Sequence, residues 1–316
     1  MARQEDSLYT AVAGDRVSLQ QLVSDWLEEY KTNKDHAMVS LVQFFISACG
    51  CSGQVTLEMM ENMEQGEMIN KLAEQFDKET PGVAGNYPVA GHGAAAKKLR
   101  GNLSEFILHL VKQAQNSILY DQYLMDNLVS LLTMLSASQV RPFRHTSTLS
   151  SMSLMTALVH VWVTVSKVQQ NMRQYLEREE DRSSNQRELD KMEKLATRLE
   201  EMEENQEEIQ KMLTYMFKSV FVHRYRDVVD DIRCVCLTEL GVWMMECPVL
   251  FMEDSYLKYL GWPLHDKVGS VRLCAIKSLL PLYGCREMKD KLVLFTEKFK
   301  ERLVSLVLDK DLEVSV

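Results

Sequence analysis

Asp227-Val-Val-Asp-Asp-Ile-Arg233 and Asp266-Lys-Val-Gly-Ser-Val-Arg272 are two copies of one spacing, and this spacing decides the fold. In each copy an Asp is followed five residues later by a branched apolar residue and six residues later by an Arg. A third copy is partial, because Asp309 is followed by Val314 but then by Ser315. The three Asp residues are 39 and 43 residues apart. This period is typical of helix pairs that stack into a repeat array.

Each position of the repeated unit has a physical role in a helix pair. An Asp near a helix N-terminus can cap exposed N–H groups and suits the positive end of the helix dipole. The branched residue one turn later is expected in the core, and the Arg after it can pair with the Asp of a neighbouring unit. These roles predict an all-α, HEAT-like helical repeat solenoid. The residues alone leave open an ordinary helical bundle in which the Asp and Arg spacing arises by chance.

The composition favours helices and limits the classes of function. Only 13 Gly and 6 Pro occur in 316 residues, which disfavours a turn-rich β fold. The formal charge of −9 excludes a molecule that is basic overall, so any nucleic-acid binding requires a local patch. The seven cysteines include no Cys-x-x-Cys pair and are expected to be free thiols in a reducing compartment, with no metal and no cofactor. Residues 149–165 are rather apolar but contain several Ser, Thr and His side chains, so they are expected to be too polar for a membrane span.

Apolar periodicity divides the chain into four segments. We expect an N-terminal helical region over 1–140, a long projecting antiparallel helical hairpin over 141–220, and HEAT-like repeats over 221–309. Residues 310–316 are expected to begin a further repeat. Because the chain stops inside that repeat, the sequence is expected to be a fragment of a longer protein.

Local signals predict several helix ends in the first segment. The first helix is expected from about Ser18 to Lys31, and Asp35 is expected to be the N-cap of the next one. Gly50 and Gly53 are expected to take the positive φ that a helix stop favours. Thr56 is expected to start the following helix.

Further along the chain, residues 77–96 contain several Gly and Pro residues and predict a loop. A turn is expected at Pro142, and another at Ser183-Ser-Asn185 between the two arms of the hairpin. Between residues 177 and 208 there are 13 acidic and 6 basic residues. The tip of the hairpin is therefore expected to be solvated and unsuited to DNA.

Two groups of basic residues are candidates for contact with nucleic-acid phosphates. Lys97, Lys98 and Arg100 follow the loop and stand at the start of a helix. A solvated helix face is the alternative that their spacing favours.

The second group is Arg141, Arg144 and His145. The alternative to nucleic-acid binding by this group is ion pairing with the many carboxylates of the same molecule. The sequence favours neither role over the other.

Five residues are candidates for binding a partner peptide. Tyr225 and Arg226 stand at the entrance of a helix, and Asp254, Lys258 and Trp262 are spaced by four along one helix face. Aromatic, Arg and charged side chains together are the composition of a protein-interface hot spot. The alternative is that Tyr225 and Trp262 belong to the core.

Four longer motifs resemble one known family. Phe221-Val-His-Arg-Tyr-Arg-Asp227, Asp254-Ser-Tyr-Leu-Lys-Tyr-Leu-Gly-Trp262 and Leu294-Phe-Thr-Glu-Lys-Phe-Lys-Glu-Arg302 are similar to the stromalin conservative domain. That domain belongs to the cohesin SA (Scc3, stromal antigen) subunits. Gln139-Val-Arg-Pro-Phe-Arg-His-Thr-Ser-Thr148 resembles a further motif of the same family. Within the family the sequence looks nearest to the meiotic SA-3 type.

The resemblance implies a non-enzymatic scaffold of cohesin in the nucleus, associated with chromatin. It implies three partners: the kleisin subunit, DNA, and regulators that present aromatic peptides, including one from the CCCTC-binding insulator protein. The resemblance carries the peptide site over to Tyr225, Arg226, Asp254, Lys258 and Trp262, and the nucleic-acid site over to Lys97 and Lys98.

Two departures from the family bear on these sites. Ala96 stands where relatives usually have Trp, and Pro263 stands where they have Thr. Either change can alter the local surface.

Two other classes of function compete with this interpretation. An enzyme is disfavoured, because the sequence has no nucleotide-binding loop, no set of metal ligands and no Ser/His/Asp arrangement. Neither a membrane nor a small-molecule substrate is expected. A generic helical-repeat adaptor or transport scaffold without a DNA role remains open.

Overall fold

The computed structural model describes residues 7–14, 18–79, 87–180 and 186–315. In these ranges all regular structure is helical, with no strand, so the predicted all-α class is confirmed. The N-terminal helices are α1 (Leu8–Ala13), α2 (Leu19–Thr32), α3 (Lys34–Ala48), α4 (Leu57–Asn62), α5 (Gln65–Glu79), α6 (Ala94–Ala114) and α7 (Leu124–Ala137). The hairpin arms are α8 (Arg141–Glu180) and α9 (Gln186–Met216). The C-terminal helices are α10 (Val222–Arg224), α11 (Asp230–Glu246), α12 (Pro248–Phe251), α13 (Asp254–Gly261), α14 (Gly269–Gly284) and α15 (Val293–Ser305).

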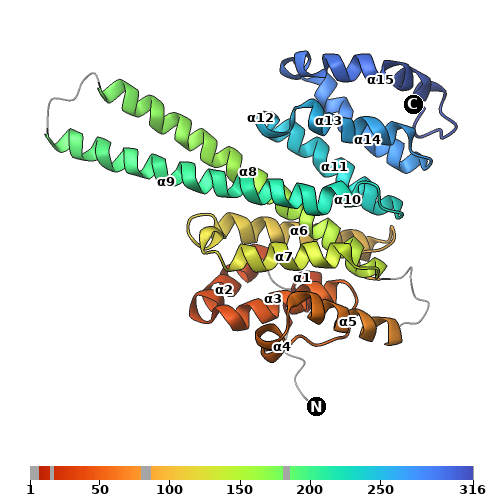
Figure 1. Cartoon of the computed structure of the whole chain (residues 1–316), viewed down its shortest axis with the longest axis horizontal. Coiled ribbons are helices and arrows are strands. Elements are labelled where there is room, and N and C mark those ends of the chain that lie inside the picture. The colour runs from red at the N-terminus through yellow and green to blue at the C-terminus, as the bar shows by residue number, and fades with distance from the viewer. Residues whose placement is uncertain (1–6, 15–17, 80–86, 181–185, 316) are drawn as a thin grey trace.

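The helices stack in layers from one end of the molecule to the other, as in a repeat solenoid (Figure 1). Helices α1 to α5 form one end, α6 and α7 follow, and α11 to α15 form the opposite end. The hairpin of α8 and α9 projects sideways from the middle of the stack, which confirms the predicted projection (Figure 1). The base of α8 packs against α6, α7 and α11, so this helix joins the N-terminal layers to the C-terminal ones.

The predicted pairing of Arg with the Asp of a neighbouring unit is confirmed. Arg233 Nε lies 2.9 Å from Asp266 Oδ2, and Arg272 Nε donates to Asp309 Oδ2 at 2.8 Å. Arg144 at the start of α8 extends the series, because its Nε lies 2.8 Å from an oxygen of Asp227. The branched residues Ile232 and Val271 are fully buried, as the spacing predicted. Each unit is therefore bound to the next by an ion pair beside the core.

The predicted capping role of these Asp residues is wrong. The N-cap residues of α11 and α14 are Val229 and Val268, two positions after the Asp. Asp227 Oδ1 accepts the Val229 N–H at 2.9 Å, and Asp266 Oδ1 accepts the Val268 N–H at the same distance. The carboxylates thus order the turn ahead of the helix, and each also pairs with the Arg of the preceding unit.

Several helix ends in the first segment differ from expectation. The N-cap of α3 is Asn33, whose Oδ1 accepts the His36 N–H at 3.1 Å, so Asp35 lies inside the first turn. Gly50 has the expected φ of +82°, but Gly53 does not have a positive φ. Gly53 is needed for space instead, because a Cβ there would lie 2.5 Å from Leu72 Cδ2. Thr56 caps α4 as predicted.

The expected turn at Pro142 is also corrected. Helix α8 begins at Arg141, so Pro142 lies in its first turn, where a missing N–H costs nothing. The expected loop over 77–96 is narrower, because α5 runs to Glu79 and α6 starts at Ala94. Pro81, Gly82, Gly85 and the expected turn at Ser183–Asn185 lie outside the described residues.

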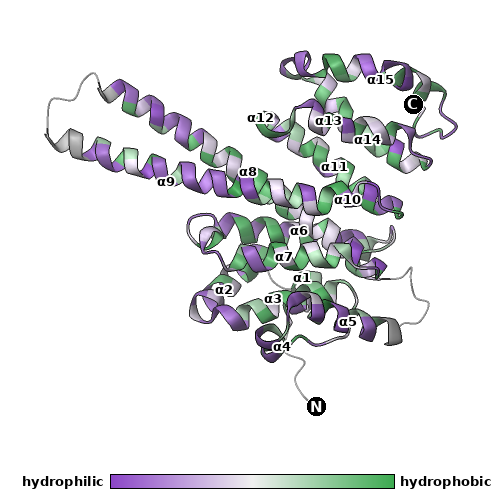
Figure 2. Cartoon of the chain, viewed as in Figure 1, coloured by the Kyte–Doolittle hydropathy of each residue, from purple (hydrophilic) through white to green (hydrophobic). Residues whose placement is uncertain are grey.

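Apolar burial in the described part of the hairpin is concentrated at its base, and farther out Gln169 of α8 is also buried. Ile209, Leu213 and Met216 of α9 are buried, whereas the seam residues nearer the tip are half-buried. Most described residues of the outer hairpin are hydrophilic (Figure 2).

Helix α8 contains an 18-residue window with a mean hydropathy of 1.4, which is long and apolar enough to cross a membrane by length and composition. This differs from the expectation that the segment is too polar for a membrane span. The fold buries 72% of the window. Several buried hydroxyls of α8 bond back to carbonyls of the same helix, as Ser147, Thr148 and Ser150 do, with Ser150 Oγ 2.8 Å from Thr146 O.

Candidate functional site

A series of aromatic rings connects the core to the surface between α10 and α13. It starts at Phe221, which is fully buried, and Tyr225 stacks on Phe221 with 6.0 Å between ring centroids. Tyr225 contacts Tyr259 at 4.9 Å and Trp262 at 6.4 Å. Trp262 is 45% exposed, so it is not a core residue. The inner rings hold the outer ones in place, and the outer faces remain available to a partner.

Two of the five predicted peptide-binding residues, Lys258 and Trp262, meet as their spacing of four suggested. The Lys258 ammonium lies 5.8 Å from the centroid of the Trp262 ring and 5.2 Å from that of Tyr259. Such a cation over an aromatic face is held by the ring quadrupole. Asp254 is exposed in the first turn of α13, two turns before Trp262. We call Tyr225, Arg226, Lys258, Tyr259 and Trp262 the Tyr225–Trp262 surface.

A groove of about 500 Å³ lies beside this surface. The residues that line it come from the turns before α11 and α14 and from the start of α11: Tyr225, Arg226, Asp227, Val228, Arg233, Trp262, Pro263, Asp266 and Lys267. A second hollow of about 370 Å³ adjoins it and shares Arg226, Asp227 and Val228. Arg226 is exposed and therefore stands between two hollows that an extended peptide could follow.

The sequence interpretation missed Val228 and Lys267 as members of this site. Val228 is 88% exposed, so its side chain is accessible to a partner in the groove. A signal for both was present, because each directly follows the Asp of a repeated unit. The same turn of successive units lies at the same edge of a solenoid, so these positions line one groove.

Tyr225 is uncharged at neutral pH. Burial raises the pKa of its phenol, while the nearby Arg226 lowers that pKa to a smaller extent. The hydroxyl therefore keeps its proton and can donate a hydrogen bond to a partner.

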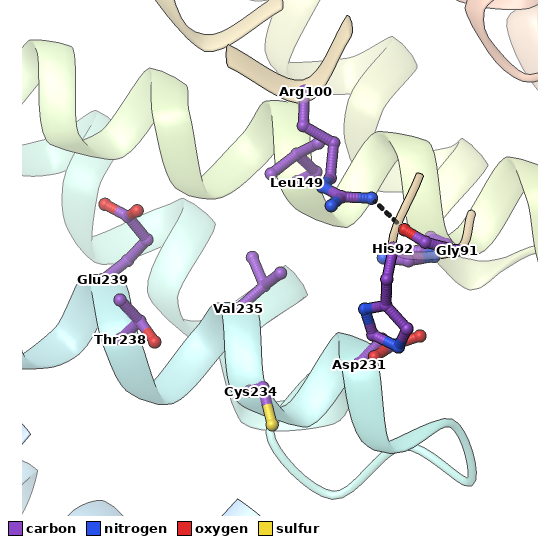
Figure 3. Close-up of a pocket in the computed structure, with 10 residues that line it drawn as sticks. Gly91, His92, Arg100, Leu149, Asp231, Cys234, Val235, Thr238 and Glu239 are labelled. Carbon is purple, nitrogen blue, oxygen red and sulfur yellow. Dashed lines mark hydrogen bonds between the residues drawn. The ribbon is translucent and has the colours of Figure 1, made fainter. Parts of the chain in front are cut away.

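The structure places the three predicted nucleic-acid-binding residues in two different environments. Lys97 and Lys98 are exposed in the first turn of α6, where the helix dipole adds to their positive potential. Arg100 is half-buried, and its Nη1 donates to the carbonyls of Val89 and Gly91, both at 2.8 Å (Figure 3). Arg100 thus fastens the segment before α6, while the two lysines face solvent.

Two residues of the second basic group, Arg144 and His145, are bound within the fold, and Arg144 makes the ion pair that the second alternative requires. Arg144 is 9% exposed and paired with Asp227, and its Nη1 donates to Ser138 O at 3.1 Å. His145 is 3% exposed, and its Nδ1 lies 2.7 Å from the Tyr87 hydroxyl. Burial lowers the pKa of His145 to about 4, so the ring is neutral at pH 7. Neither side chain offers a cation to nucleic acid.

A cavity of about 250 Å³ lies between α6, α8 and α11 (Figure 3). Its walls combine imidazole, guanidinium, carboxyl and thiol side chains: His92, Arg100, His145, Asp231, Cys234 and Glu239. Burial raises the pKa of Glu239, whose carboxylate accepts a hydrogen bond from Thr156 at 2.5 Å. Within the described ranges, no group of three or more His, Cys, Asp or Glu residues could hold a metal ion.

Two family models match the chain. The STAG domain model matches residues 85–211, and the model of the stromalin conservative domain matches residues 226–300. The second match contains the two full repeated units and most of the Tyr225–Trp262 surface.

Curated relatives match along nearly all of the chain. It is 47% identical over 310 residues to cohesin subunit SA-1 of Xenopus laevis, covering 98% of this chain and 24% of that protein. It is 46% identical over 311 residues to cohesin subunit SA-3 of Homo sapiens, covering 98% and 25%. It is 41% identical over 316 residues to cohesin subunit scc-3 of Caenorhabditis elegans, covering 100% and 28%. The chain thus spans about a quarter of the length of these relatives, and the similar identities to SA-1 and SA-3 favour neither subtype.

Among solved structures, cohesin subunit Scc3 from Z. rouxii, residues 88–1035, superposes with a TM-score of 0.84. The match has 24% sequence identity and covers 97% of this chain and 35% of that one. At this identity the superposition supports the solenoid fold.

Proposed function

The chain belongs to the SA/Scc3 family of cohesin subunits, and from this we propose that it is a non-enzymatic scaffold of cohesin that binds peptides, DNA and kleisin. Its activity would consist of holding partners together for sister chromatid cohesion and chromosome organisation, on chromatin in the nucleus. A role in meiosis is the narrower form of this proposal.

The Tyr225–Trp262 surface carries the proposal for peptide binding. Trp262 is 45% exposed although it is a large aromatic residue, and it adjoins a groove of about 500 Å³. Arg226 and Lys258 place two cations beside the rings. This arrangement fits an extended peptide with an aromatic side chain to stack on Trp262 and a carboxylate to pair with the cations.

Binding of a fluorescent peptide with an aromatic residue next to an acidic one tests this proposal, with and without a kleisin fragment. We expect Trp262→Ala and Arg226→Glu each to weaken binding about tenfold or more, because central aromatic and Arg residues dominate such interfaces. Tyr215→Ala is the matched control, since Tyr215 is 53% exposed on α9 away from the groove. Equal affinity of all four proteins, with unchanged helical content, would reject the peptide site.

Lys97 and Lys98 carry the proposal for DNA binding. They are exposed at the positive end of α6, and the charge of −9 resides largely elsewhere, because residues 177–208 alone carry 13 acidic and 6 basic side chains. The contact would be with phosphates and independent of base sequence.

The dependence of duplex binding on salt tests this second proposal. We expect the double variant Lys97→Glu/Lys98→Glu to bind more weakly and to reduce the slope of log K against log[salt] by roughly two, one for each phosphate that a lysine no longer neutralises. The matched control is Lys191→Glu/Lys194→Glu, which changes two exposed lysines of the hairpin. If the wild-type chain shows no DNA binding at moderate salt, the generic adaptor without a DNA role becomes the better assignment.

A further inference from the structure

We propose that Cys234 and Cys274 form a redox-sensitive thiol pair that joins α11 to α14 through a reversible disulfide when a peroxide is present. The two residues lie 40 positions apart, on equivalent helices of successive repeat units. This modification is independent of the functions proposed above.

Helical spacing places both thiols on the faces where α11 and α14 meet. Along α11, Cys234, Leu237 and Gly241 share one face, and along α14, Cys274 and Ser278 share another. Ser278 Oγ donates to the Leu237 carbonyl at 3.0 Å, so these faces are in contact. Cys234 and Cys274 stand one to two turns nearer the helix starts on the same faces.

The helices are close enough for a disulfide. A Cβ added at Gly241 would lie 2.6 Å from Ser278 Cβ and 3.1 Å from Ser278 Cα. From this close packing we infer that Cys234 and Cys274, on the same two faces, can approach within the Cα separation of about 4.4–6.8 Å that a disulfide requires. Each of the two thiols is close enough to the other to shift its pKa.

The surroundings of the pair favour reaction of one thiol. The hydrogen bond from Cys234 lowers the pKa of Cys274 to about 7, and Thr238 and Lys277 act in the same direction. A substantial share of Cys274 is therefore thiolate at neutral pH, which is the nucleophilic form. Both cysteines are half-exposed, and Cys234 lines the cavity of Figure 3 with its sulfur pointing away from Arg100. By contrast, Cys49 and Cys236 are fully buried, and burial raises the pKa of each.

The reaction needs only the two thiols and the peroxide. The Cys274 thiolate attacks one peroxide oxygen, the O–O bond breaks, and hydroxide or alkoxide leaves with the electron pair, which gives a sulfenic acid. Cys234 then gives up its proton and attacks the Cys274 sulfur, so the S–S bond forms and water leaves. Two electrons pass from the thiols to the peroxide. A dithiol reductant reverses the step by thiol–disulfide exchange.

Counting thiols and mapping peptides after peroxide treatment tests the proposal. In the wild-type chain we expect titratable thiols after denaturation to fall from seven to five, a loss of two. A disulfide-linked peptide joining Cys234 to Cys274 should be found, and it should disappear with a dithiol reductant. The midpoint of thermal unfolding should rise by several degrees in the oxidised form, because the cross-link restricts the unfolded chain.

Variants then assign the order of attack. Cys234→Ser should accumulate a sulfenic acid at Cys274 that a dimedone probe traps, whereas Cys274→Ser should lose the linked peptide and leave Cys234 reduced. Cys285→Ser is the matched control, since Cys285 is also half-exposed, and it should form the linkage as the wild type does. Retention of all seven thiols by the folded wild type, or overoxidation of Cys274 with Cys234 still reduced, would overturn the proposal.

Discussion

Single carboxylates in this molecule serve two neighbours at once. Asp266 accepts the Val268 N–H through Oδ1 and pairs with Arg233, so it orders its own turn and holds the preceding unit. Arg233 also donates to the Asp227 carbonyl at 2.7 Å. Arg233 is buried and Asp266 is largely covered, so removing one partner leaves the other mostly desolvated without its counter-charge.

Arg233→Ala is therefore expected to be strongly destabilising. The side chains of Arg233 and Asp266 are 7% and 17% exposed, and loss of the Arg should lower the free energy of unfolding by about 3 kcal/mol. Urea denaturation followed by circular dichroism measures the change.

Arg198→Ala is the control for this prediction, because Arg198 pairs with Glu201 where both side chains are more than half exposed. Arg198→Ala should lower the free energy of unfolding by less than about 0.5 kcal/mol. Similar midpoints for the two variants would mean that the Arg–Asp series contributes little to stability.

His145 makes the stability of the chain depend on pH. Its pKa is about 4 in the folded protein and about 6.5 in an unfolded chain, so the unfolded state binds more protons between these values. The free energy of unfolding should be highest above pH 6.5 and should fall as the pH drops towards 4, by up to about 3 kcal/mol from this group.

Comparing His145→Gln with the wild type isolates this effect, because the carboxylates that titrate in the same range are common to both proteins. The variant is expected to lose less stability between pH 7 and pH 4.5. Parallel stability curves for the two proteins would show that His145 is not the buried neutral group described.

At the scale of elements, α11 and α14 are joined in three ways. Their starts are bound by the Arg233–Asp266 pair, and their middles meet at Gly241 and Ser278. The third is the proximity of the Cys234 and Cys274 thiols, each of which shifts the pKa of the other. Close approach in the middle requires a residue without a side chain, which explains a Gly inside a helix despite its cost in propensity.

Two glycine-to-alanine substitutions measure this requirement. Gly241→Ala should lower the free energy of unfolding by about 1–3 kcal/mol, because the added methyl group would lie 2.6 Å from Ser278 Cβ. Gly101→Ala, in α6, should raise it by about 0.5–1 kcal/mol, since nothing lies within 4 Å of its Cβ position.

Thermal unfolding of both variants and of the wild type is the measurement for these substitutions. The same sign of change at both positions would contradict the close approach of α11 to α14. Adding Ser278→Gly to Gly241→Ala should recover part of the loss if the two side chains collide.

At the scale of the whole molecule, the layered body and the hairpin differ in how they are held. Each layer of the body buries apolar side chains against the next, as a solenoid does. The outer hairpin relies on half-buried seam residues and exposed ion pairs, such as Arg173 with Glu203 at 2.5 Å. The body should therefore fold without the tip.

Deleting residues 174–202 and joining Arg173 to Glu203 by a short Gly/Ser loop tests this separation. The two residues already face each other across the hairpin, so a short loop suffices. We expect the midpoint of thermal unfolding to change by less than about 2 °C, because surface changes away from the core have small effects on stability. Helical circular dichroism should decrease in line with the residues removed, and a loss of cooperative unfolding would show that the tip supports the body.

Much of the architecture follows from local patterns in the sequence. The spacing of Asp, a branched apolar residue and Arg predicted the solenoid and its ion pairs, because stacked units place equivalent positions beside each other. Apolar periodicity predicted the two hairpin arms, since a seam at helical spacing is visible along the chain. The motifs around Tyr225 and Trp262 pointed to a family that the comparisons confirm.

Only the tertiary structure decided which of the predicted site residues face solvent. Spacing could not show that Trp262 is exposed while His145 is buried, because burial depends on helices far away in the chain. Spacing also could not show that Lys97 is exposed, whereas the Arg100 guanidinium binds the carbonyls of Val89 and Gly91. The groove beside Val228 is likewise formed by turns some 40 residues apart. Helical periodicity is a local property and therefore readable from the sequence, whereas exposure and grooves result from the stacking of distant units.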